Sequence, residues 1–314
     1  MKGKFTPFSE LMKKIAAGEF VYTGELEPHK TTDISETIEW ARTLKATGKV
    51  TAANVTDNPS STACISSLVA AYIIQRETGL ETIYQLRTAD RNRLALVSDV
   101  LGAGALGLKN ILALTGDHTM LGDNPQSKPV FDLDGTQLIA MIKQMVYEGK
   151  DPAGNEIANP PKINVGAAAQ PGADPLEMEI LKMERKVEAG AEFFQTQVVF
   201  DVEVALKFLD EASHLNVPIL IGIFPPKNYG QAEYFSKYVP GVTVPDQFLA
   251  DLKKLSEISD KAERKRKINE YNVEYFSNFI REIKKKPVCK GCHIMAVGYP
   301  EVIGPIVERV EKGA

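Results

Sequence analysis

The sequence contains few cysteines and lacks a long apolar run. Three cysteines in 314 residues are too few for a disulfide framework, which indicates a reducing compartment. The N-terminal segment MKGKFTPFSELMKKIAAGEF lacks the apolar core of a signal peptide. No apolar stretch approaches the roughly 20 residues that span a bilayer. We therefore expect a cytoplasmic protein that does not cross a membrane.

A basic excess is also missing. The 41 Asp and Glu residues outnumber the 37 Lys and Arg residues, for a net charge of −4. Proteins that bind the nucleic acid backbone normally carry a positive excess, so nucleic acid is not an expected partner. The sequence also lacks an H-E-x-x-H motif, a Walker loop and a G-x-S-x-G elbow, and the chemistries that depend on these motifs are excluded.

Short apolar runs alternate with longer segments of helical periodicity, such as Val202, Leu206 and Leu209. This alternation predicts parallel βαβ units, and eight of them would close into a (β/α)8 TIM barrel. A doubly wound open sheet is the alternative, but the first strand is followed by Pro28 rather than by a glycine-rich phosphate turn. The predicted strands are 20–27, 50–56, 82–88, 109–115, 163–169, 193–199, 218–224 and 292–298.

We expect residues 1–314 to form one catalytic barrel domain, with 1–18 as a short N-terminal helix and further helical segments added. Two connections are long. The first, 118–133, follows the fourth strand on the face where such barrels hold their chemistry, which is typical of a lid. The second, 239–263, contains the helical pattern DQFLADLKKLSEI, and KAERKRK at 261–267 begins a long helix with a solvated face.

Glu25 and Glu27 are the candidate acids of the first strand. Their spacing places both on one face, roughly 7 Å apart. Mutual repulsion and partial burial would raise their pKa values and favour a protonated general acid near neutral pH. The alternative for either carboxylate is an ion pair with a nearby Lys or Arg.

Two other strand ends carry polar groups that suit a ligand. Gly116 allows a ligand to approach the backbone closely, and Asp117 could tune a cofactor or cap the next turn. Gln195 and Gln197 share one face of the sixth strand. Because buried amides need partners, a bicyclic heterocycle with an amide group would suit them.

The polar residues that end the third strand have two interpretations. Gln85 and Arg87 are followed by the run DRNR at 90–93. This cluster could hold phosphates or cap the third helix.

The run CKGCH at 289–293 has the spacing of c-type haem attachment. The absence of an export signal argues against haem, and a zinc site would need ligands from a partner chain. We therefore expect no metal site. Cys289 and Cys292 are interpreted as reduced, exposed thiols at the start of the eighth strand, where they could mark a partner surface.

Six motifs follow one another along the chain: TGELEP, NVTDNP, DRNR, ALTGD, ERKVEAGAEFFQTQ and HIMAVG. In this order they resemble the methylenetetrahydrofolate reductase family, flavoprotein barrels of one-carbon metabolism, and the resemblance runs from Val21 to Val310. It implies reduction of 5,10-methylenetetrahydrofolate to 5-methyltetrahydrofolate. A general acid would protonate N10 and open the folate ring, and hydride would then pass from flavin N5.

The resemblance also implies roles for individual residues. Glu25, rather than Glu27, would be the general acid, and Asp117 would adjust the flavin and stabilise the substrate cation. Gln197 would hydrogen-bond the pterin, and Phe235 would stack on the substrate. The flavin-binding positions that it implies are Thr56, Gln85, Thr115, Gly116, Asp117, Arg185 and Lys186.

Some features depart from the best-known bacterial members. Gln85 replaces a histidine and Thr115 an arginine, and the loop after the fifth strand is shorter, which leaves both FMN and FAD open as the cofactor. The chain lacks the C-terminal regulatory domain of eukaryotic relatives and is similar to acetogen-like catalytic barrel subunits. The electron donor would be NAD(P)H or an electron-delivering, metal-bearing partner subunit, in a homo- or hetero-oligomer.

Two other functions remain open at this point. A folate-dependent methyltransferase barrel also binds pterins at its strand ends, and it would be colourless. A non-catalytic subunit that binds folate or flavin for a partner would keep its function after Glu25→Gln.

Overall fold

The computed structural model describes residues 5–313, and its eight parallel strands close into one barrel in chain order. β1 pairs with β2 on one side and with β8 on the other, which confirms the predicted (β/α)8 architecture. The strands are β1 (Val21–Leu26), β2 (Val50–Val55), β3 (Glu81–Arg87), β4 (Asn110–Leu114), β5 (Asn164–Ala169), β6 (Phe193–Val198), β7 (Ile219–Ile223) and β8 (Cys289–Ile294).

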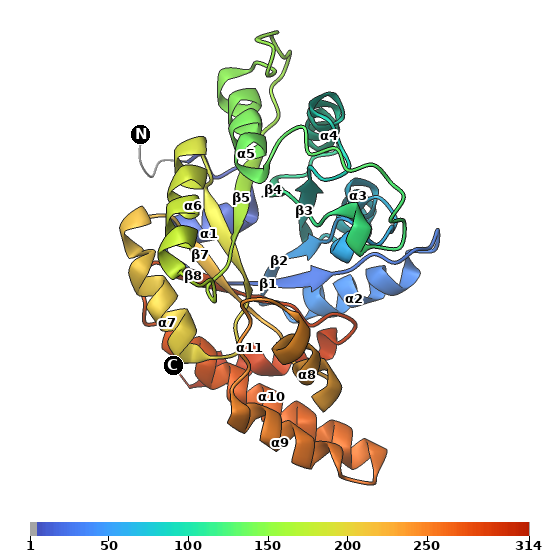
Figure 1. Ribbon diagram of the computed structural model, residues 1–314, viewed down its shortest axis with the longest axis vertical. Helices are drawn as coiled ribbons and strands as arrows, with labels where there is room; N and C mark the ends of the chain where they lie inside the picture. The colour runs from blue at the N-terminus through green and yellow to red at the C-terminus, as the bar shows by residue number, and fades with distance from the viewer. Residues whose placement is uncertain (1–4, 314) are drawn as a thin grey trace.

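Helices follow the strands and surround the barrel. The α-helices are α1 (Glu10–Ala16), α2 (Ser35–Ala46), α3 (Ser67–Thr78), α4 (Arg93–Ala105), α5 (Gly135–Lys143), α6 (Leu176–Ala189), α7 (Val202–Glu211), α8 (Tyr229–Tyr238), α9 (Asp246–Ser256), α10 (Lys261–Ile283) and α11 (Ile303–Lys312). Single turns occur at η1 (Pro59–Ser61), η2 (Thr119–Leu121), η3 (Gln144–Glu148), η4 (Ser213–Leu215) and η5 (Pro300–Val302). Figure 1 shows the helices arranged around the central strands.

The interior of the barrel is closed at its amino end. Leu11, Met12 and Ile15 of α1 form one buried cluster with side chains of six strands: Val21, Ala52, Ile83, Leu112, Phe193 and Leu220. The Ser9 side chain caps α1 by accepting from the backbone N–H of Met12. Since α1 covers this end, the polar residues at the carboxyl ends of the strands surround the other mouth.

The N-terminal helix is shorter than predicted. α1 occupies Glu10–Ala16, within the predicted range 1–18, and residues 1–4 of that range lie outside the described residues. Gly18, at a φ of +85°, follows the C-cap residue Ala17, in a backbone conformation that ends helices.

The eighth strand begins earlier than predicted, and its thiols are not exposed. β8 spans Cys289–Ile294, so the CKGC run lies inside the strand. Gly291 is required there, because a Cβ atom would lie 2.5 Å from the Val21 carbonyl oxygen of β1. Cys289 and Cys292 are buried, and burial raises the pKa of Cys289 to about 12. The interpretation of these residues as exposed thiols at a partner surface is therefore wrong.

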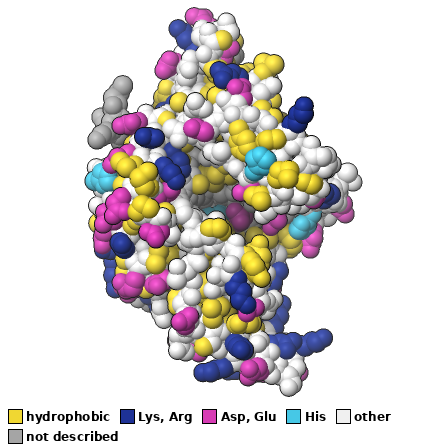
Figure 2. All heavy atoms as spheres, in the orientation of Figure 1, with side chains coloured by type: hydrophobic (Ala, Val, Ile, Leu, Met, Phe, Trp, Pro, Cys, Tyr) yellow, Lys and Arg dark blue, Asp and Glu magenta, His cyan; other side chains and the backbone are white. Residues whose placement is uncertain are grey.

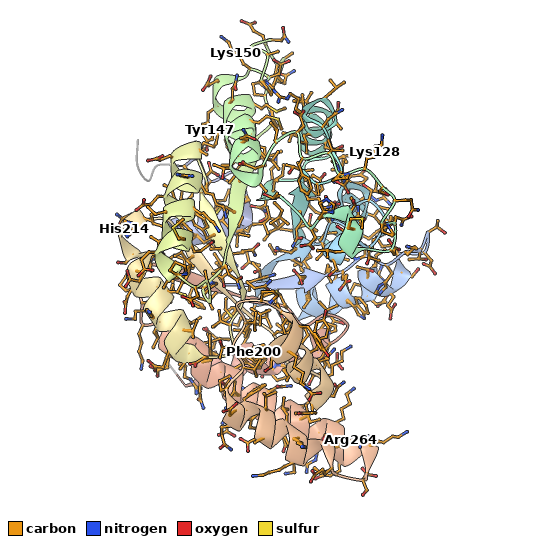
Figure 3. The ribbon with its side chains drawn as sticks, in the orientation of Figure 1. Lys128, Tyr147, Lys150, Phe200, His214 and Arg264 are labelled. Atoms are coloured by element: carbon orange, nitrogen blue, oxygen red, sulfur yellow. The ribbon has the colours of Figure 1, made fainter. Side chains whose placement is uncertain are left out.

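The long connection 239–263 contains α9, as its pattern predicts, and α10 follows it. Phe248 of α9 and Phe276 of α10 pack on Phe200, with ring centroids 5.6 and 6.2 Å away. Phe200 lies beside these helices, whereas Arg264 lies toward the outer end of α10 (Figure 3). Charged side chains on α10, such as Arg266 and Glu270, pair with one another at the surface. Within residues 5–313, no helix combines the length and the apolar character of a membrane span.

Candidate functional site

A polar cavity of about 270 Å³ opens at the carboxyl ends of the strands. Figure 2 shows the molecule hollowed at the centre of this face. Four of the predicted site residues line the cavity together: Glu25 from β1, Gln85 from β3, Lys186 from α6 and Gln197 from β6. They are far apart in the sequence, and barrel closure brings them to one mouth.

A larger cavity, of about 390 Å³, lies at the opposite end of the barrel. Apolar residues dominate its lining, among them Ile15, Val217 and Val288, and none of the predicted site residues line it. We place the candidate site at the smaller cavity, because it gathers the polar groups at the end of the barrel where such folds perform chemistry.

Two carboxylic acids line the cavity, Glu179 and Glu25, and Glu25 is the one that contacts His293. Its Oε2 lies 3.4 Å from Nε2 of His293 and 3.5 Å from the amide nitrogen of Gln85. Glu27 follows β1 and does not line the cavity. Burial raises the pKa of Glu27, and repulsion from Glu25 adds to the rise. The geometry therefore separates the two candidate acids, and it places Glu25 at the cavity.

His293 is a site residue that sequence reasoning missed. It is 3% exposed, and its Nδ1 lies 2.9 Å from the Thr23 hydroxyl oxygen. In the sequence, His293 stands out only as part of the CKGCH run and as the first residue of the HIMAVG motif, neither of which predicts a place beside Glu25. Within residues 5–313, no group of three His, Cys, Asp or Glu side chains could hold a metal ion. The signal that could have revealed its role is strand register, because His293 pairs directly with Thr23 across β8 and β1.

Lys186 reaches the cavity from outside the barrel. Its Nζ donates to the Ala168 carbonyl oxygen of β5 at 2.7 Å. Burial lowers the pKa of Lys186, while the nearby Glu179 carboxylate opposes this shift. The neighbouring Arg185 is exposed and does not line the cavity.

The segment Thr115–Asp117 follows β4 and is exposed, outside the cavity lining. The Thr115 hydroxyl accepts from the backbone N–H of Gly135 at the start of α5, at 2.9 Å. The Asp117 carbonyl accepts from the Ser61 hydroxyl at 2.8 Å. The next turn, η2, is capped by the His118 side chain, so the alternative role of Asp117 as a turn cap is wrong.

Thr56 and Phe235 also lie outside the cavity lining. Thr56 follows β2, and its buried hydroxyl oxygen has no hydrogen-bond partner among the described residues. Phe235 of α8 packs against Phe224, with ring centroids 4.5 Å apart. Phe224 directly follows β7 at the carboxyl end of the barrel, so the two rings form an aromatic layer beside the mouth.

Charged residues at and after the end of β3 form an internal ion network with Asp57, which follows β2. Arg91 contacts the carboxylates of Asp57, Asp90 and Asp99 at 2.7–3.0 Å, and Arg87 pairs with Asp90 at 2.8 Å. Burial alone would lower the pKa of Arg91, but the adjacent carboxylates outweigh it and the net shift is upward. These arginines are thus engaged by carboxylates.

Asn92 performs the second role predicted for the DRNR run, the capping of a helix. Its side chain accepts from the backbone N–H of Ala95 and caps α4. The structure therefore favours helix capping over phosphate binding for this part of the run.

Gly116→Ala is expected to destabilise the protein more than Gly107→Ala. Both glycines have positive φ, +84° and +76°, which should cost an alanine about 1–2 kcal/mol. A Cβ at Gly107 would meet nothing within 4 Å, whereas one at Gly116 would lie 3.0 Å from Cδ of Arg87. Overpacking of this kind adds about 1–3 kcal/mol. Urea denaturation of both variants measures the difference, and equal losses would contradict the predicted overlap.

Comparison with known proteins identifies the family. Residues 10–311 match the family described as "Methylenetetrahydrofolate reductase". The 5,10-methylenetetrahydrofolate reductase of Pectobacterium carotovorum is 27% identical over 55% of this chain and 53% of its own length. Methylenetetrahydrofolate reductase 2 of Schizosaccharomyces pombe is 24% identical over 87% of this chain and 42% of its own length. The chain thus spans about half the length of the curated relatives it matches.

A solved structure shares the fold. It is a protein from Clostridium thermocellum whose structure is described as binding two copies of 5-methyl-5,6,7,8-tetrahydrofolic acid. It superposes with a TM-score of 0.64 over 96% of this chain and 98% of its own, at 16% identity. Because the family match covers nearly the whole chain, the protein belongs to the methylenetetrahydrofolate reductase family.

Proposed function

We propose that this protein reduces 5,10-methylenetetrahydrofolate to 5-methyltetrahydrofolate with the help of a bound flavin. Family membership and the names of the relatives support the reaction, and the folate described for the Clostridium thermocellum protein supports the substrate class. The observation that carries the proposal is the position of Glu25, a carboxylic acid beside His293 in the polar cavity.

The residues around the mouth fit a flavin. An isoalloxazine ring accepts hydrogen bonds at its carbonyl oxygens and unprotonated nitrogens, and two donors, the Lys186 ammonium and the Gln85 amide, line the cavity. The buried Thr56 hydroxyl, without a partner among the described residues, could supply another contact. The bound flavin would supply the hydride, and we propose Thr56, Gln85, Thr115, Gly116, Asp117, Arg185 and Lys186 as the residues that hold it.

Glu25 would act as the general acid. A protonated carboxyl group in the cavity can donate its proton to N10 of the substrate, which opens the five-membered ring of the folate and leaves a cation at N5. After it has given up the proton, Glu25 is a carboxylate, and the hydrogen bond from His293 then stabilises its negative charge. Solution protons reach Glu25 again through the open mouth of the cavity.

Three further side chains would bind and orient the substrate. Gln197 is an exposed amide of the cavity lining and can hydrogen-bond the pterin. The Asp117 carboxylate at the exposed rim can stabilise the substrate cation by charge. Phe235, at the aromatic layer beside the mouth, can stack on the substrate.

The first experiment is the visible spectrum of the purified protein, with chromatography of any cofactor released by denaturation. We expect flavin absorbance that a reductant bleaches and that 5,10-methylenetetrahydrofolate restores. The chromatogram separates FMN from FAD. Bleaching by NADH or NADPH alone would identify a pyridine nucleotide as the electron donor, whereas a requirement for a second protein would indicate a partner subunit. A colourless protein that takes up no flavin would contradict the proposal and favour a methyltransferase or a binding subunit.

A further inference from the structure

A continuous chain of buried polar side chains leads from the barrel interior to Glu25. Asn54 of β2 contacts Gln195 of β6, Gln195 contacts Thr23 of β1, and Thr23 contacts His293 of β8, which contacts Glu25. The first four are at most 3% exposed. Because buried polar groups must find their partners within the protein, the hydrogens of this chain are constrained by one another.

The inner end of the chain is a reciprocal amide pair. Asn54 donates from Nδ2 to Oε1 of Gln195 at 2.8 Å, and Gln195 donates from Nε2 to Oδ1 of Asn54 at 3.0 Å. The second N–H of Gln195 is directed to the Thr23 hydroxyl oxygen at 3.2 Å. Thr23 therefore receives a hydrogen from Gln195.

The amide pair determines which nitrogen of His293 carries the proton. Since Thr23 accepts from Gln195, its own single hydrogen is free to be donated to Nδ1 of His293, 2.9 Å away. Nδ1 is then an acceptor, so the neutral ring carries its hydrogen on Nε2. That N–H faces Oε2 of Glu25 at 3.4 Å.

If both amide groups were rotated by 180°, the two hydrogen bonds between Asn54 and Gln195 would be kept, but the contact between His293 and Glu25 would change. Gln195 would then present its oxygen to Thr23, Thr23 would accept from Nδ1–H, and Nε2 would be an acceptor facing Glu25. Oε2 of Glu25 already accepts from the Gln85 amide at 3.5 Å. In the rotated arrangement two acceptors, Nε2 and Oε2, would face each other and repel, whereas an N–H on Nε2 faces an acceptor oxygen.

We propose that the Asn54–Gln195 amide pair positions the acid of the site by holding His293 as the neutral Nε2–H tautomer, a donor to Glu25. Gln195 and Asn54 act through Thr23 and His293 and are positioning residues. The catalytic part of the inference rests on the proposed function: the donor keeps Glu25 oriented in the cavity and stabilises the carboxylate left after proton transfer. The tautomer itself does not depend on which reaction the protein performs.

The direct test is nitrogen NMR of protein labelled with 15N-histidine, which reports the tautomer of each ring. The other three histidines, His29, His118 and His214, are exposed, and His293→Gln assigns the buried ring by loss of its signals. We expect the Nε2–H tautomer in the protein as isolated at neutral pH. An Nδ1–H tautomer or a doubly protonated ring would overturn the proposal. The ionisable groups near the His293 ring are Glu25, which contacts it, and Glu179 and Lys186, which line the same cavity.

Gln195→Met tests the amide pair, and Gln197→Met is its matched control. Gln195→Met removes the donor to Thr23, so the hydroxyl can accept from Nδ1–H as readily as it donates, and we expect a mixture of tautomers. Gln197 lies on the same strand and lines the same cavity but is not bonded to Thr23, so the tautomer should be unchanged in that variant. An unchanged tautomer in Gln195→Met would overturn the proposal.

A second pair of variants covers the case in which Gln195→Met does not fold. Thr23→Val removes the hydroxyl link and should release the tautomer, whereas Thr23→Ser keeps the hydroxyl and should retain it. Retention of the Nε2–H tautomer in Thr23→Val would contradict the inference.

Kinetics separate this inference from the proposed function. If the protein reduces methylenetetrahydrofolate, Gln195→Met should lower kcat about tenfold, on the order of the effect of one lost hydrogen bond, with KM and flavin content little changed. Equal turnover in Gln195→Met and the wild-type protein would contradict the catalytic part of the inference. If no variant and no wild-type protein reduces folate, the proposed function fails, while the NMR result on the tautomer stands.

Discussion

Replacing Glu25 with glutamine is expected to lower the rate of 5,10-methylenetetrahydrofolate reduction by about 10²- to 10⁴-fold, the range of general acid catalysis. Glutamine has almost the same shape and can accept from His293 and Gln85, which contact Oε2 of Glu25. It has no acidic proton to give to N10. The loss should therefore fall on the step that opens the folate ring.

Two half-reactions measured separately localise the effect. Bleaching of the flavin by its reductant should be retained in Glu25→Gln, whereas reoxidation by 5,10-methylenetetrahydrofolate should be slow. Glu27→Gln is the matched control, because Glu27 is the neighbouring carboxylic acid outside the cavity lining, and it should reoxidise at nearly the wild-type rate. The opposite ranking of the two variants would exclude Glu25 as the acid.

Arg91→Met is expected to lower the free energy of unfolding by about 3–5 kcal/mol, the usual effect of removing one partner from a buried ion pair. The Asp57 carboxylate that it contacts is 1% exposed, so the charge would remain without its counter-ion. The same substitution at Arg93 is the control. Arg93 pairs with Asp132 at the surface and is itself 57% exposed, and such pairs contribute about 0–1 kcal/mol. Urea denaturation measures both.

A double variant separates lost charge compensation from lost packing. Asp57→Asn with Arg91→Met leaves a neutral amide where the buried carboxylate was, and its oxygen can still accept from the backbone N–H of Arg87. We expect the double variant to be more stable than Arg91→Met alone. If it is less stable, packing around Arg91 rather than the buried charge explains the loss.

The stability deficit of Arg91→Met should also depend on pH. Burial raises the pKa of Asp57, and Arg91 opposes that rise, so removing Arg91 should raise the pKa further. A group whose pKa is higher in the folded state takes up its proton on folding, and stability then increases as pH falls. The deficit relative to wild type should therefore shrink toward acidic pH.

Strand order and most strand positions were predictable, because parallel strands buried on both faces leave apolar runs that are visible in a sequence. The exception is β8. Its lysine and glycine interrupt the apolar pattern, and the reason for Gly291, the close approach of the Val21 carbonyl, exists only after the barrel has closed.

The chain by itself determined the fold class and the family. Apolar periodicity specifies which segments are strands and helices. The order of short motifs such as TGELEP along the chain indicates the family. Only the tertiary structure decided that His293, Thr23, Gln195 and Asn54 form one hydrogen-bonded chain, and that Cys289 and Cys292 are buried. The physical reason is that these contacts depend on register between strands far apart in the sequence, which is set when the barrel closes β8 against β1.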